Sequence, residues 1–364
     1  MHTMDKEDIE KFKDVVRENA ASLISVARNV PSRAPNLEVI TEYLRRQCEI
    51  DQHRGRILSK MLGSLRHVPA CEFLARLHLV ATQLKTSLRG RKFSIILPGR
   101  WSEGWEYTRC MEKSNFFIAI IFMSLLPALL NQFKDFVCYG KHNIYTDDNN
   151  TVSDFVYLDD ASFSGEQAEK SIEDFENGVG ASKASTSTVH VCILYAKTGV
   201  KTRIEGPLKH FDSTKWYPDS DGIEHPKPLQ DKFDNWTSDD RDIVAQFVER
   251  SDRKPLGDTA VKTLFYTDFK VADDFSTYPN FFFDPVLLYP DGRVEHINKS
   301  LLSNCESRKE DYDTMMGGHC PKPVYREDWS APYSFPIATF PTWDRKDIDY
   351  AWNPSKKAGT KRKL

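Results

Sequence analysis

The chain has 364 residues, of which 40% are hydrophobic and 12% aromatic, with 50 lysines and arginines against 53 aspartates and glutamates. This length suits one large domain or two ordinary ones, and the apolar content excludes a disordered, collagen-like or disulfide-scaffold protein. The net charge of −3 divides into blocks of opposite sign, with +7 over residues 1–100, −15 over residues 101–355 and +5 over residues 356–364.

The cysteines and the apolar runs bear on the cellular compartment. Seven cysteines are scattered without CxxC spacing, which is typical of reduced thiols in an intracellular protein. The charged N-terminus, MHTMDKEDIEKFKD, predicts no signal peptide. The most apolar run, residues 116–130, is interrupted by Pro127 and is shorter than the roughly 20 residues that span a bilayer. We expect no membrane contact and a cytoplasmic location, although the basic tail 356–364 also suits a nuclear address.

The N-terminal part of the chain is helical by pattern. Apolar residues recur at spacings of three and four over residues 37–48, 57–65 and 73–84, with prolines between these stretches. This periodicity predicts three amphipathic helices. We therefore predict a basic helical region over residues 1–90.

From Lys92 onward, short apolar runs alternate with helical patterns. The predicted strands lie at residues 93–97, 136–139, 155–158, 189–195 and 263–266. The predicted helices lie at residues 105–113, 116–133 and 165–177. Strands that alternate with helices predict an α/β fold with a mostly parallel sheet flanked by helices.

The remaining segments lack such periodicity. We predict a core over residues 91–284 that contains a flexible connection at 178–188 and a polar, proline-rich insertion at about 197–258. An irregular C-terminal segment at residues 285–355 and the basic tail 356–364 follow this core.

One stretch, FVYLDDASFSGEQAEKSI at residues 155–172, combines features that bind ligands. Its strand ends in Asp159 and Asp160, which places two carboxylates at the edge of a sheet where open α/β folds bind ligands. The following loop enters a helix whose first amides are unpaired and suit a phosphate. Ser162 and Ser164 offer hydroxyl donors there.

The same stretch also predicts the kind of ligand. Gly165 lets the backbone approach an anion closely. Two carboxylates beside a phosphate cradle would repel a bare phosphate, so they predict sugar hydroxyls or a bridging divalent cation. An alternative interpretation makes Asp159 and Asp160 a helix N-cap and a solvated turn.

This stretch resembles the phosphoribosyl-pyrophosphate (PRPP) motif of type I phosphoribosyltransferases, with four hydrophobic residues, an acidic pair and a small-residue loop. The resemblance implies that Asp159 and Asp160 are catalytic residues that hold the ribose hydroxyls, in part through Mg²⁺. It implies that the loop binds the 5′-phosphate through Ser162, Phe163, Ser164, Gly165, Glu166 and Gln167. Phe163 and Glu166 depart from the commoner residues and argue against nucleobase salvage more than against sugar-phosphate binding.

Other segments extend the resemblance. The loop PGRWSEGWEYTR after the first core strand is similar to the family's pyrophosphate loop, through Arg100, Ser102, Glu103 and Gly104. Residues 140–153 are similar to the loop that closes over the site, and they contain Lys141 and His142. TDFKVADDFSTYP places Lys270, Asp273 and Asp274 after another strand. A surface turn or a solvated loop is the alternative for each of these sets.

The combination of an N-terminal helical region, this variant loop and a K-x-x-D-D-x-S segment resembles the divergent PRTase-CE branch, which is associated with conflict and viral systems. The resemblance implies an Mg²⁺-dependent enzyme that transfers phosphoribosyl from PRPP to an acceptor and releases pyrophosphate. Residues 101–355 carry a net charge of −15, which would repel an anionic ligand. This charge also favours a cation that binds together with the ligand.

Two other functions stay open from the sequence. An inactive phosphoribosyltransferase fold would sense a nucleotide or a sugar phosphate. A nucleic-acid or acidic partner would instead bind the basic N-terminal helices and the tail. The acceptor and the oligomeric state are not assigned by any motif.

Overall fold

The computed structural model describes residues 6–29, 32–97, 114–138, 152–162, 165–196, 199–218, 237–248, 265–268, 281–282 and 285–303. These residues form two compact units, each built from separated segments of the chain. Unit 1 contains the described residues up to 29 and those from 74 to 218, and unit 2 contains those from 32 to 73 and from 237 to 303. The predicted domain boundaries stay a prediction.

Unit 1 is built on a five-stranded sheet in which every pair is parallel. Its strand order is β3-β2-β4-β5-β6, with β4 in the centre. The strands are β2 (Phe93–Leu97), β3 (Phe133–Cys138), β4 (Asp154–Ser162), β5 (Thr188–Ala196) and β6 (Ser213–Tyr217). Four of these were predicted from the sequence, and the α/β fold with a parallel sheet is confirmed.

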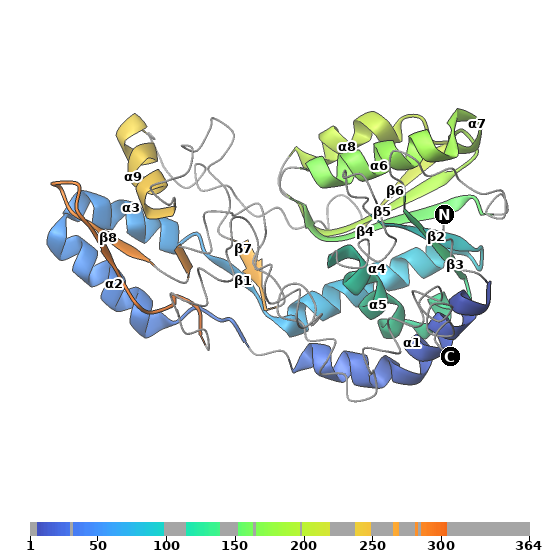
Figure 1. Ribbon diagram of the computed structural model, residues 1–364, viewed down its shortest axis with the longest axis horizontal. Coiled ribbons are helices and arrows are strands. Elements are labelled where there is room, and N and C mark those ends of the chain that lie inside the picture. The colour runs from blue at the N-terminus through green and yellow to red at the C-terminus, as the bar shows by residue number, and fades with distance from the viewer. Residues whose placement is uncertain are drawn as a thin grey trace, which may run out of the picture. The chain divides into compact units, whose positions relative to one another are not determined.

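Helices cover both faces of this sheet, as the crossovers between parallel strands require (Figure 1). One face carries α6 (Glu166–Val179), α7 (Ala181–Ala184) and α8 (Val200–Leu208). The other carries α1 (Lys6–Arg28), α4 (Ala70–Leu88) and α5 (Ser114–Leu125). Both α1 and α4 lie within the N-terminal region that was predicted to be helical.

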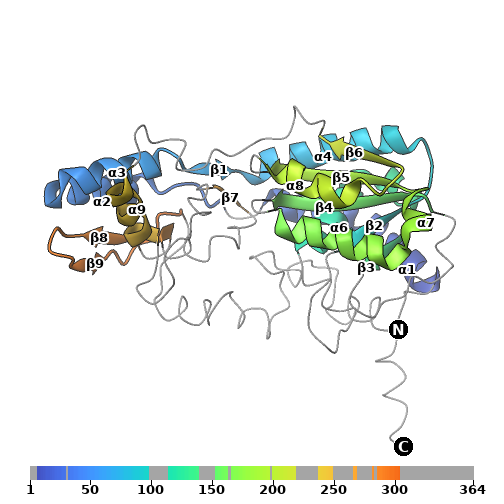
Figure 2. The same ribbon diagram turned by 90° about the horizontal axis from the view of Figure 1, so that it is seen from above.

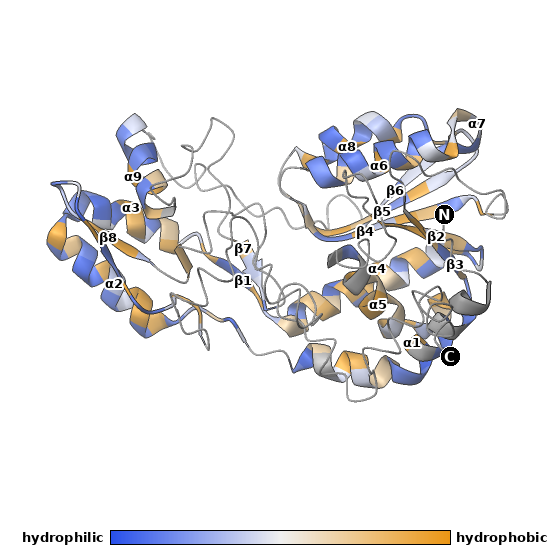
Figure 3. Cartoon of the chain, in the orientation of Figure 1, coloured by the Kyte–Doolittle hydropathy of each residue, from blue (hydrophilic) through white to orange (hydrophobic). Residues whose placement is uncertain are grey.

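The core of unit 1 lies between the sheet and these helices. The side chains of β4 are buried at eight of its nine positions, which is typical of a strand covered on both faces. Phe155 of β4 packs against Phe175 of α6 with ring centroids 4.6 Å apart, and Phe175 stacks on Phe211 at 5.8 Å. Hydrophobic residues line α5 and the strands, whereas α6 and α8 are hydrophilic on the side away from the sheet (Figure 3).

The structure corrects the helix predicted over residues 116–133. The helix α5 ends at Leu125, Pro127 opens a short 3₁₀ turn (η2, Pro127–Leu129), and Phe133 already begins β3. Periodicity does not separate a buried helix from a buried strand when both are apolar throughout. The break falls at Pro127, which lacks the N–H that would continue the helix.

The structure also corrects two predicted connections. The segment predicted as a polar insertion at 197–258 begins with α8 and β6, and β6 completes the core sheet beside β5. As an edge strand, β6 keeps most side chains partly exposed, so its sequence lacks the apolar run of a buried strand. The predicted flexible connection at 178–188 contains the end of α6 and the short helix α7.

Unit 2 contains α2 (Leu37–Ile50), α3 (Gln52–Leu62), α9 (Ser238–Val248) and a hairpin of β8 (Val286–Leu288) and β9 (Val294–His296). The hairpin lies beside α2 and α9 (Figure 2). The predicted strand at 263–266 corresponds to β7 (Phe265–Thr267), which pairs in parallel with β1 (Arg66–Val68) outside the core sheet.

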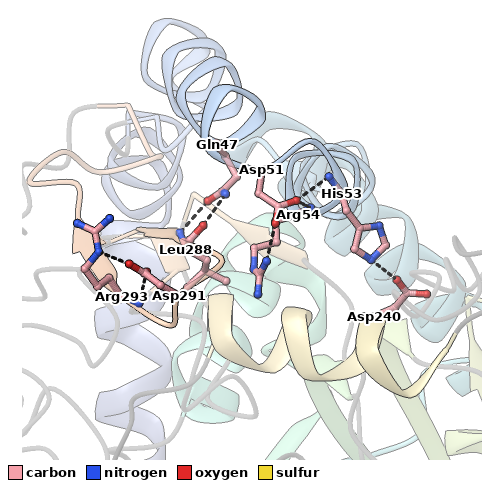
Figure 4. A network of polar contacts seen from close by, with 8 residues as sticks. All are labelled: Gln47, Asp51, His53, Arg54, Asp240, Leu288, Asp291 and Arg293. Carbon is pink, nitrogen blue, oxygen red and sulfur yellow. Dashed lines mark hydrogen bonds and ion pairs between the residues drawn. The ribbon is translucent and has the colours of Figure 1, made fainter.

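Polar side chains join the elements of unit 2 (Figure 4). The side-chain amide of Gln47 donates to the Leu288 carbonyl at 2.9 Å and accepts from the Leu288 N–H at 2.8 Å, so it pairs with the buried backbone of β8 as another strand would. His53 lies 3.3 Å from Asp240, which connects α3 to α9. Buried backbone groups need such partners.

The crossing of α2 and α3 depends on Gly55. A Cβ at this position would lie 2.4 Å from Cys48 Sγ and 2.9 Å from Cys48 Cα. We expect Gly55→Ala to destabilise the protein by about 1–3 kcal/mol, because the helices must separate. Gly206→Ala in α8 is the control, since nothing lies within 4 Å of its Cβ and alanine is the better helix former. Urea unfolding measures the stability of both variants. Equal stability of the two would contradict the close approach of α3 to α2 at Gly55.

None of the helices in the described part of the chain has the length and apolarity to cross a bilayer.

Candidate functional site

The acidic pair lies at the carboxyl end of the central strand. Asp159 and Asp160 occupy β4 beside Ile193 of β5, and each side chain is 4% exposed. The strand continues to Ser162, which is 6% exposed and pairs with Ala196. Because all five strands are parallel, their carboxyl ends meet at this edge, where α/β folds bind ligands.

Hydrogen bonds hold the carboxylate of Asp159. The hydroxyl of Tyr157 donates to Asp159 Oδ2 at 3.0 Å, and the backbone N–H of Asp160 donates to Asp159 Oδ1 at 3.0 Å. A carboxylate that accepts two such bonds is stabilised in its ionised form. The acidic pair is therefore built into the strand end as part of a buried network.

The helix that follows starts from a glycine. Gly165 is the N-cap of α6 and adopts a left-handed conformation with φ +75°, which favours glycine. Gly165 makes no side-chain cap bond, and the first turn of a helix is the place where backbone amides can bind an anion. The alternative role of Asp159 and Asp160 as a helix cap stays a prediction.

The space around Gly165 is limited by α8. A Cβ at Gly165 would lie 3.2 Å from Cδ of Arg203 and 3.6 Å from Cα of Val200. The first turns of α6 and α8 are therefore close neighbours at this edge. Arg203 also forms an ion pair with Glu169 of α6, which brings a positive charge beside the start of a helix that carries Glu166 and Glu169 in its first turn.

Two side-chain amides lie behind the acidic pair. Asn115, at the start of α5 and fully buried, donates to the Leu158 carbonyl at 2.6 Å. Gln167 of α6 donates to Asn115 Oδ1 at 3.1 Å. Burial first, and then the Asp159 carboxylate, raise the pKa of Tyr157 well above its ordinary value, while hydrogen bonds from Asn115 and Gln167 act in the opposite direction. Tyr157 therefore keeps its proton and acts as a donor.

The structure brings together part of the predicted site. Asp159, Asp160, Ser162, Gly165, Glu166 and Gln167 all lie at the junction of β4 and α6. The other predicted site residues fall outside the described ranges, namely Phe163, Ser164, Arg100, Ser102, Glu103, Gly104, Lys141, His142, Lys270, Asp273 and Asp274. The basic tail also falls outside them.

The donor set at this edge suits a magnesium ion that arrives with its ligand. Within the described ranges, no group of three or more His, Cys, Asp or Glu side chains comes together as a metal cage. Mg²⁺ is commonly held by one or two carboxylates, with substrate oxygens and water completing its shell. The carboxylates of Asp159 and Asp160 fit that pattern.

The comparison with protein families agrees with this geometry. The PRTase-CE family profile matches residues 73–277, which is more than half of the chain. The chain belongs to the PRTase-CE family. No curated protein and no solved structure matches it significantly. All five strands of the core sheet and the acidic pair of this PRTase-CE protein lie within the matched residues, and membership makes its function phosphoribosyltransferase-like at the level of the family.

Three residues around the acidic pair of this PRTase-CE protein were not predicted from the sequence. Tyr157 stands in an apolar run, but its spacing of two from Asp159 on a strand is a signal that the two side chains share a face. Asn115 and Arg203 are distant in the sequence, and nothing in their local pattern indicates that they approach the β4–α6 junction.

Proposed function

We propose that this PRTase-CE protein binds PRPP together with Mg²⁺ and transfers its phosphoribosyl group to an acceptor. The observation that carries the proposal is the junction of β4 and α6. Two buried carboxylates and a helix that starts from a left-handed glycine lie within one short stretch of chain at the carboxyl edge of a parallel sheet. This combination suits a ligand that carries both sugar hydroxyls and a phosphate.

The 5′-phosphate and the ribose of PRPP each find a matching group in this proposal. The first amides of α6, after Gly165, bind the 5′-phosphate, and Ser162 adds a hydroxyl donor. The acidic pair binds the ribose hydroxyls. Glu166 and Glu169 lie close to the proposed phosphate position, and the positive charge of Arg203 offsets part of their repulsion.

The transfer needs orientation and charge stabilisation more than a nucleophilic side chain. The bond between the anomeric carbon and the pyrophosphate oxygen breaks, the electron pair leaves with pyrophosphate, and a nucleophilic atom of the acceptor bonds to the anomeric carbon and loses its proton. The Asp159 and Asp160 carboxylates stabilise the positive charge that develops on the sugar. Mg²⁺, when bound, neutralises the departing pyrophosphate.

Isothermal calorimetry with PRPP tests this proposal, in the presence of Mg²⁺ and in EDTA. We expect binding that requires Mg²⁺, because residues 101–355 carry a net charge of −15 and the ligand is itself strongly anionic. No binding at millimolar PRPP with Mg²⁺ would exclude the proposal.

Pyrophosphate release with a panel of acceptors then separates an enzyme from a binding module. Release that depends on both PRPP and an acceptor supports transfer. Tight binding without release from any acceptor would favour a sensor of sugar phosphates, and the acidic first turn of α6 is the feature that would account for lost turnover.

A further inference from the structure

The turn that joins α4 to β2 carries a concentration of positive charge. Residues 85–92 (KTSLRGRK) contain four basic side chains and no acidic one, and residues 73–102 contain no aspartate or glutamate at all. Lys85, Arg89, Arg91 and Lys92 are all exposed. Because residues 101–355 carry a net charge of −15, this basic turn is not the product of a uniformly basic chain.

This turn lies at the amino edge of the core sheet, opposite the candidate active site. Lys92 immediately precedes β2, whose first residue pairs with Asp154 at the start of β4. Arg91 donates to Asp154 Oδ1 at 2.9 Å, and this bond fixes the turn to the start of β4. The acidic pair lies at the other end of β4. A ligand of the turn would therefore be separate from a ligand of the β4–α6 junction.

Two other elements bring further cations to this edge. Lys215 of β6 donates from Nζ to Ser87 Oγ at 3.2 Å, so its charge lies beside the last turn of α4. Lys92 donates to the Asn131 carbonyl at 2.6 Å, and the Asn131 side chain also accepts from Arg17 of α1 at 3.5 Å. The exposed cations around the turn form what we call the amino-edge patch, namely Lys85, Arg89, Arg91, Lys92 and Lys215.

Most of this patch is not neutralised by the protein. Arg91 forms an ion pair with Asp154, but the other four members form no ion pair with a described residue. Asp212, just before β6, is an exposed carboxylate at the same edge and offsets only part of the positive charge. A surface with several uncompensated cations attracts an anionic partner.

The backbone of Arg89 is an independent observation. Arg89 has φ +51° and Gly90 has φ +85°, so two successive left-handed residues follow α4. Glycine adopts this conformation readily, whereas other residues do so at a cost. The exposed side chain of Arg89 forms no ion pair with a described residue that would offset the cost. Backbone strain of this kind points to a role in binding.

The chemistry of the patch fits phosphate groups. Arginine and lysine are the side chains that neutralise the phosphates of nucleic acids, and the guanidinium group matches them with two parallel hydrogen bonds. A membrane surface would also need exposed apolar side chains beside the charges. The large apolar side chains exposed in the described ranges are Leu37, Leu79 and Val294, and none belongs to the turn.

The form of the nucleic acid follows from the lack of rings in the turn. Proteins that bind single strands stack the bases on aromatic side chains. Residues 85–92 contain no aromatic residue, and Trp216, next to Lys215, packs against the hydrophobic core. A duplex presents its phosphates without unstacked bases, so it needs cations alone.

We propose that the amino-edge patch binds the phosphate backbone of double-stranded nucleic acid, at the edge of the sheet opposite the candidate active site. Contacts to phosphates carry no sequence information, so the binding does not select a sequence. This inference does not depend on the proposed function, because the residues and the ligand are different.

Fluorescence anisotropy with a fluorescein-labelled duplex of mixed sequence tests this inference on the full chain. A DNA duplex and an RNA duplex of the same sequence form two arms, which distinguish the two sources of the backbone. We expect wild-type binding that weakens steeply between about 50 and 200 mM salt, because phosphate contacts release counterions. If neither duplex bound at the lower salt concentration, the proposal would be overturned.

Arg89→Gly with Lys92→Gln removes two cations of the patch. We expect this double variant to bind the duplex roughly tenfold more weakly, and the slope of log affinity against log salt to become shallower by about 2. Arg56→Gln with Arg241→Gln is the matched control, since it removes two exposed cations from α3 and α9 in unit 2. Equal affinity of the two double variants would overturn the assignment to the patch. The basic tail is the same in all of these proteins.

Melting temperatures separate lost binding from lost folding. Glycine adopts the left-handed conformation at lower cost, so Arg89→Gly alone should melt at no lower temperature than the wild type and still bind the duplex more weakly. Arg89→Lys keeps the charge and should retain most of the affinity. A lower melting temperature for Arg89→Gly, or an unchanged affinity, would show that Arg89 serves the fold and would overturn its role in binding.

Competition decides between classes of partner. Unlabelled duplex should displace the labelled duplex at a lower concentration of negative charge than polyglutamate, phosphatidylserine vesicles or a single strand of the same sequence. If any of these three competed as well as the duplex, the assignment to double-stranded nucleic acid would be overturned.

Discussion

Replacing Asp159 and Asp160 together with asparagine should abolish Mg²⁺-dependent PRPP binding. Each substitution removes a negative charge that would bind ribose hydroxyls or share the cation, and hydrogen bonds to charged groups contribute about 1.5–3 kcal/mol each. Two such losses correspond to a dissociation constant that rises by roughly a hundredfold or more. Calorimetry with PRPP and Mg²⁺, on wild type and double variant in the same buffer, measures this change.

A second double variant controls for the loss of negative charge alone. Asp239→Asn with Asp242→Asn removes two exposed carboxylates from α9 in unit 2. These side chains do not belong to the β4–α6 junction, so we expect nearly unchanged affinity. Equal affinity of wild type and the Asp159/Asp160 variant would show that the acidic pair serves only the fold.

Asp154→Ala should destabilise unit 1 without touching the carboxyl edge of the sheet. Asp154 begins β4, at the opposite end of the strand from the acidic pair, and is 1% exposed. It lies 2.9 Å from Nε2 of the fully buried His190 and 2.9 Å from Arg91. Removing the carboxylate leaves His190 without this partner in the core. The free energy of unfolding should fall by roughly 3 kcal/mol. For a unit of this size the melting temperature should fall by about 6–12 °C, as measured by calorimetric scanning.

The same group of residues predicts how stability depends on pH. Burial lowers the pKa of His190, although the hydrogen bond that His190 donates to Asp154 acts against this. A histidine whose pKa is lowered by folding binds its proton more weakly in the native state, so stability falls as the pH drops below the ordinary value of 6.5. The melting temperature of the wild type should therefore fall between pH 6.5 and pH 5.

Asp154 contributes to the pH dependence of stability at a lower pH than His190 does. Burial acts to raise the pKa of Asp154, but the hydrogen bond and charge of His190 and the charge of Arg91 outweigh burial and lower it. Its contribution is present above the ordinary value of 3.8 and is lost as the pH falls through the lowered value in the folded state. His190→Gln removes the histidine titration, so its melting temperature should vary less between pH 6.5 and pH 5. If the melting temperatures of wild type and His190→Gln fell equally between pH 6.5 and pH 5, His190 would not be the group that titrates in this range.

Much of the fold could be predicted because the buried strands carry their own signal. The apolar runs at 93–97, 155–158 and 189–195 are central strands covered on both faces, and such strands are apolar at nearly every position. The edge strand β6 has no such run, because one side of it meets solvent. It was therefore taken for part of an insertion, although it completes the sheet.

The residues of the candidate site also divide into those that the sequence predicts and those that it does not. Asp159, Asp160 and Gly165 were predicted because they follow one another along the chain, where a strand ends and a helix begins. Asn115 and Arg203 reach the same junction from α5 and α8, and no local pattern marks a residue that arrives from another element. The pairing of β1 with β7 outside the core sheet likewise joins segments about 200 residues apart.

The sequence alone determined that this chain has a parallel α/β core and an acidic pair followed by a phosphate-type loop, because both depend on short-range patterns of apolar residues, charge and glycine. Only the tertiary structure decided how the pair is held. The hydrogen bond from Gln167 to Asn115 and the approach of Arg203 to Gly165 follow from which side chains meet when separate helices pack beside β4.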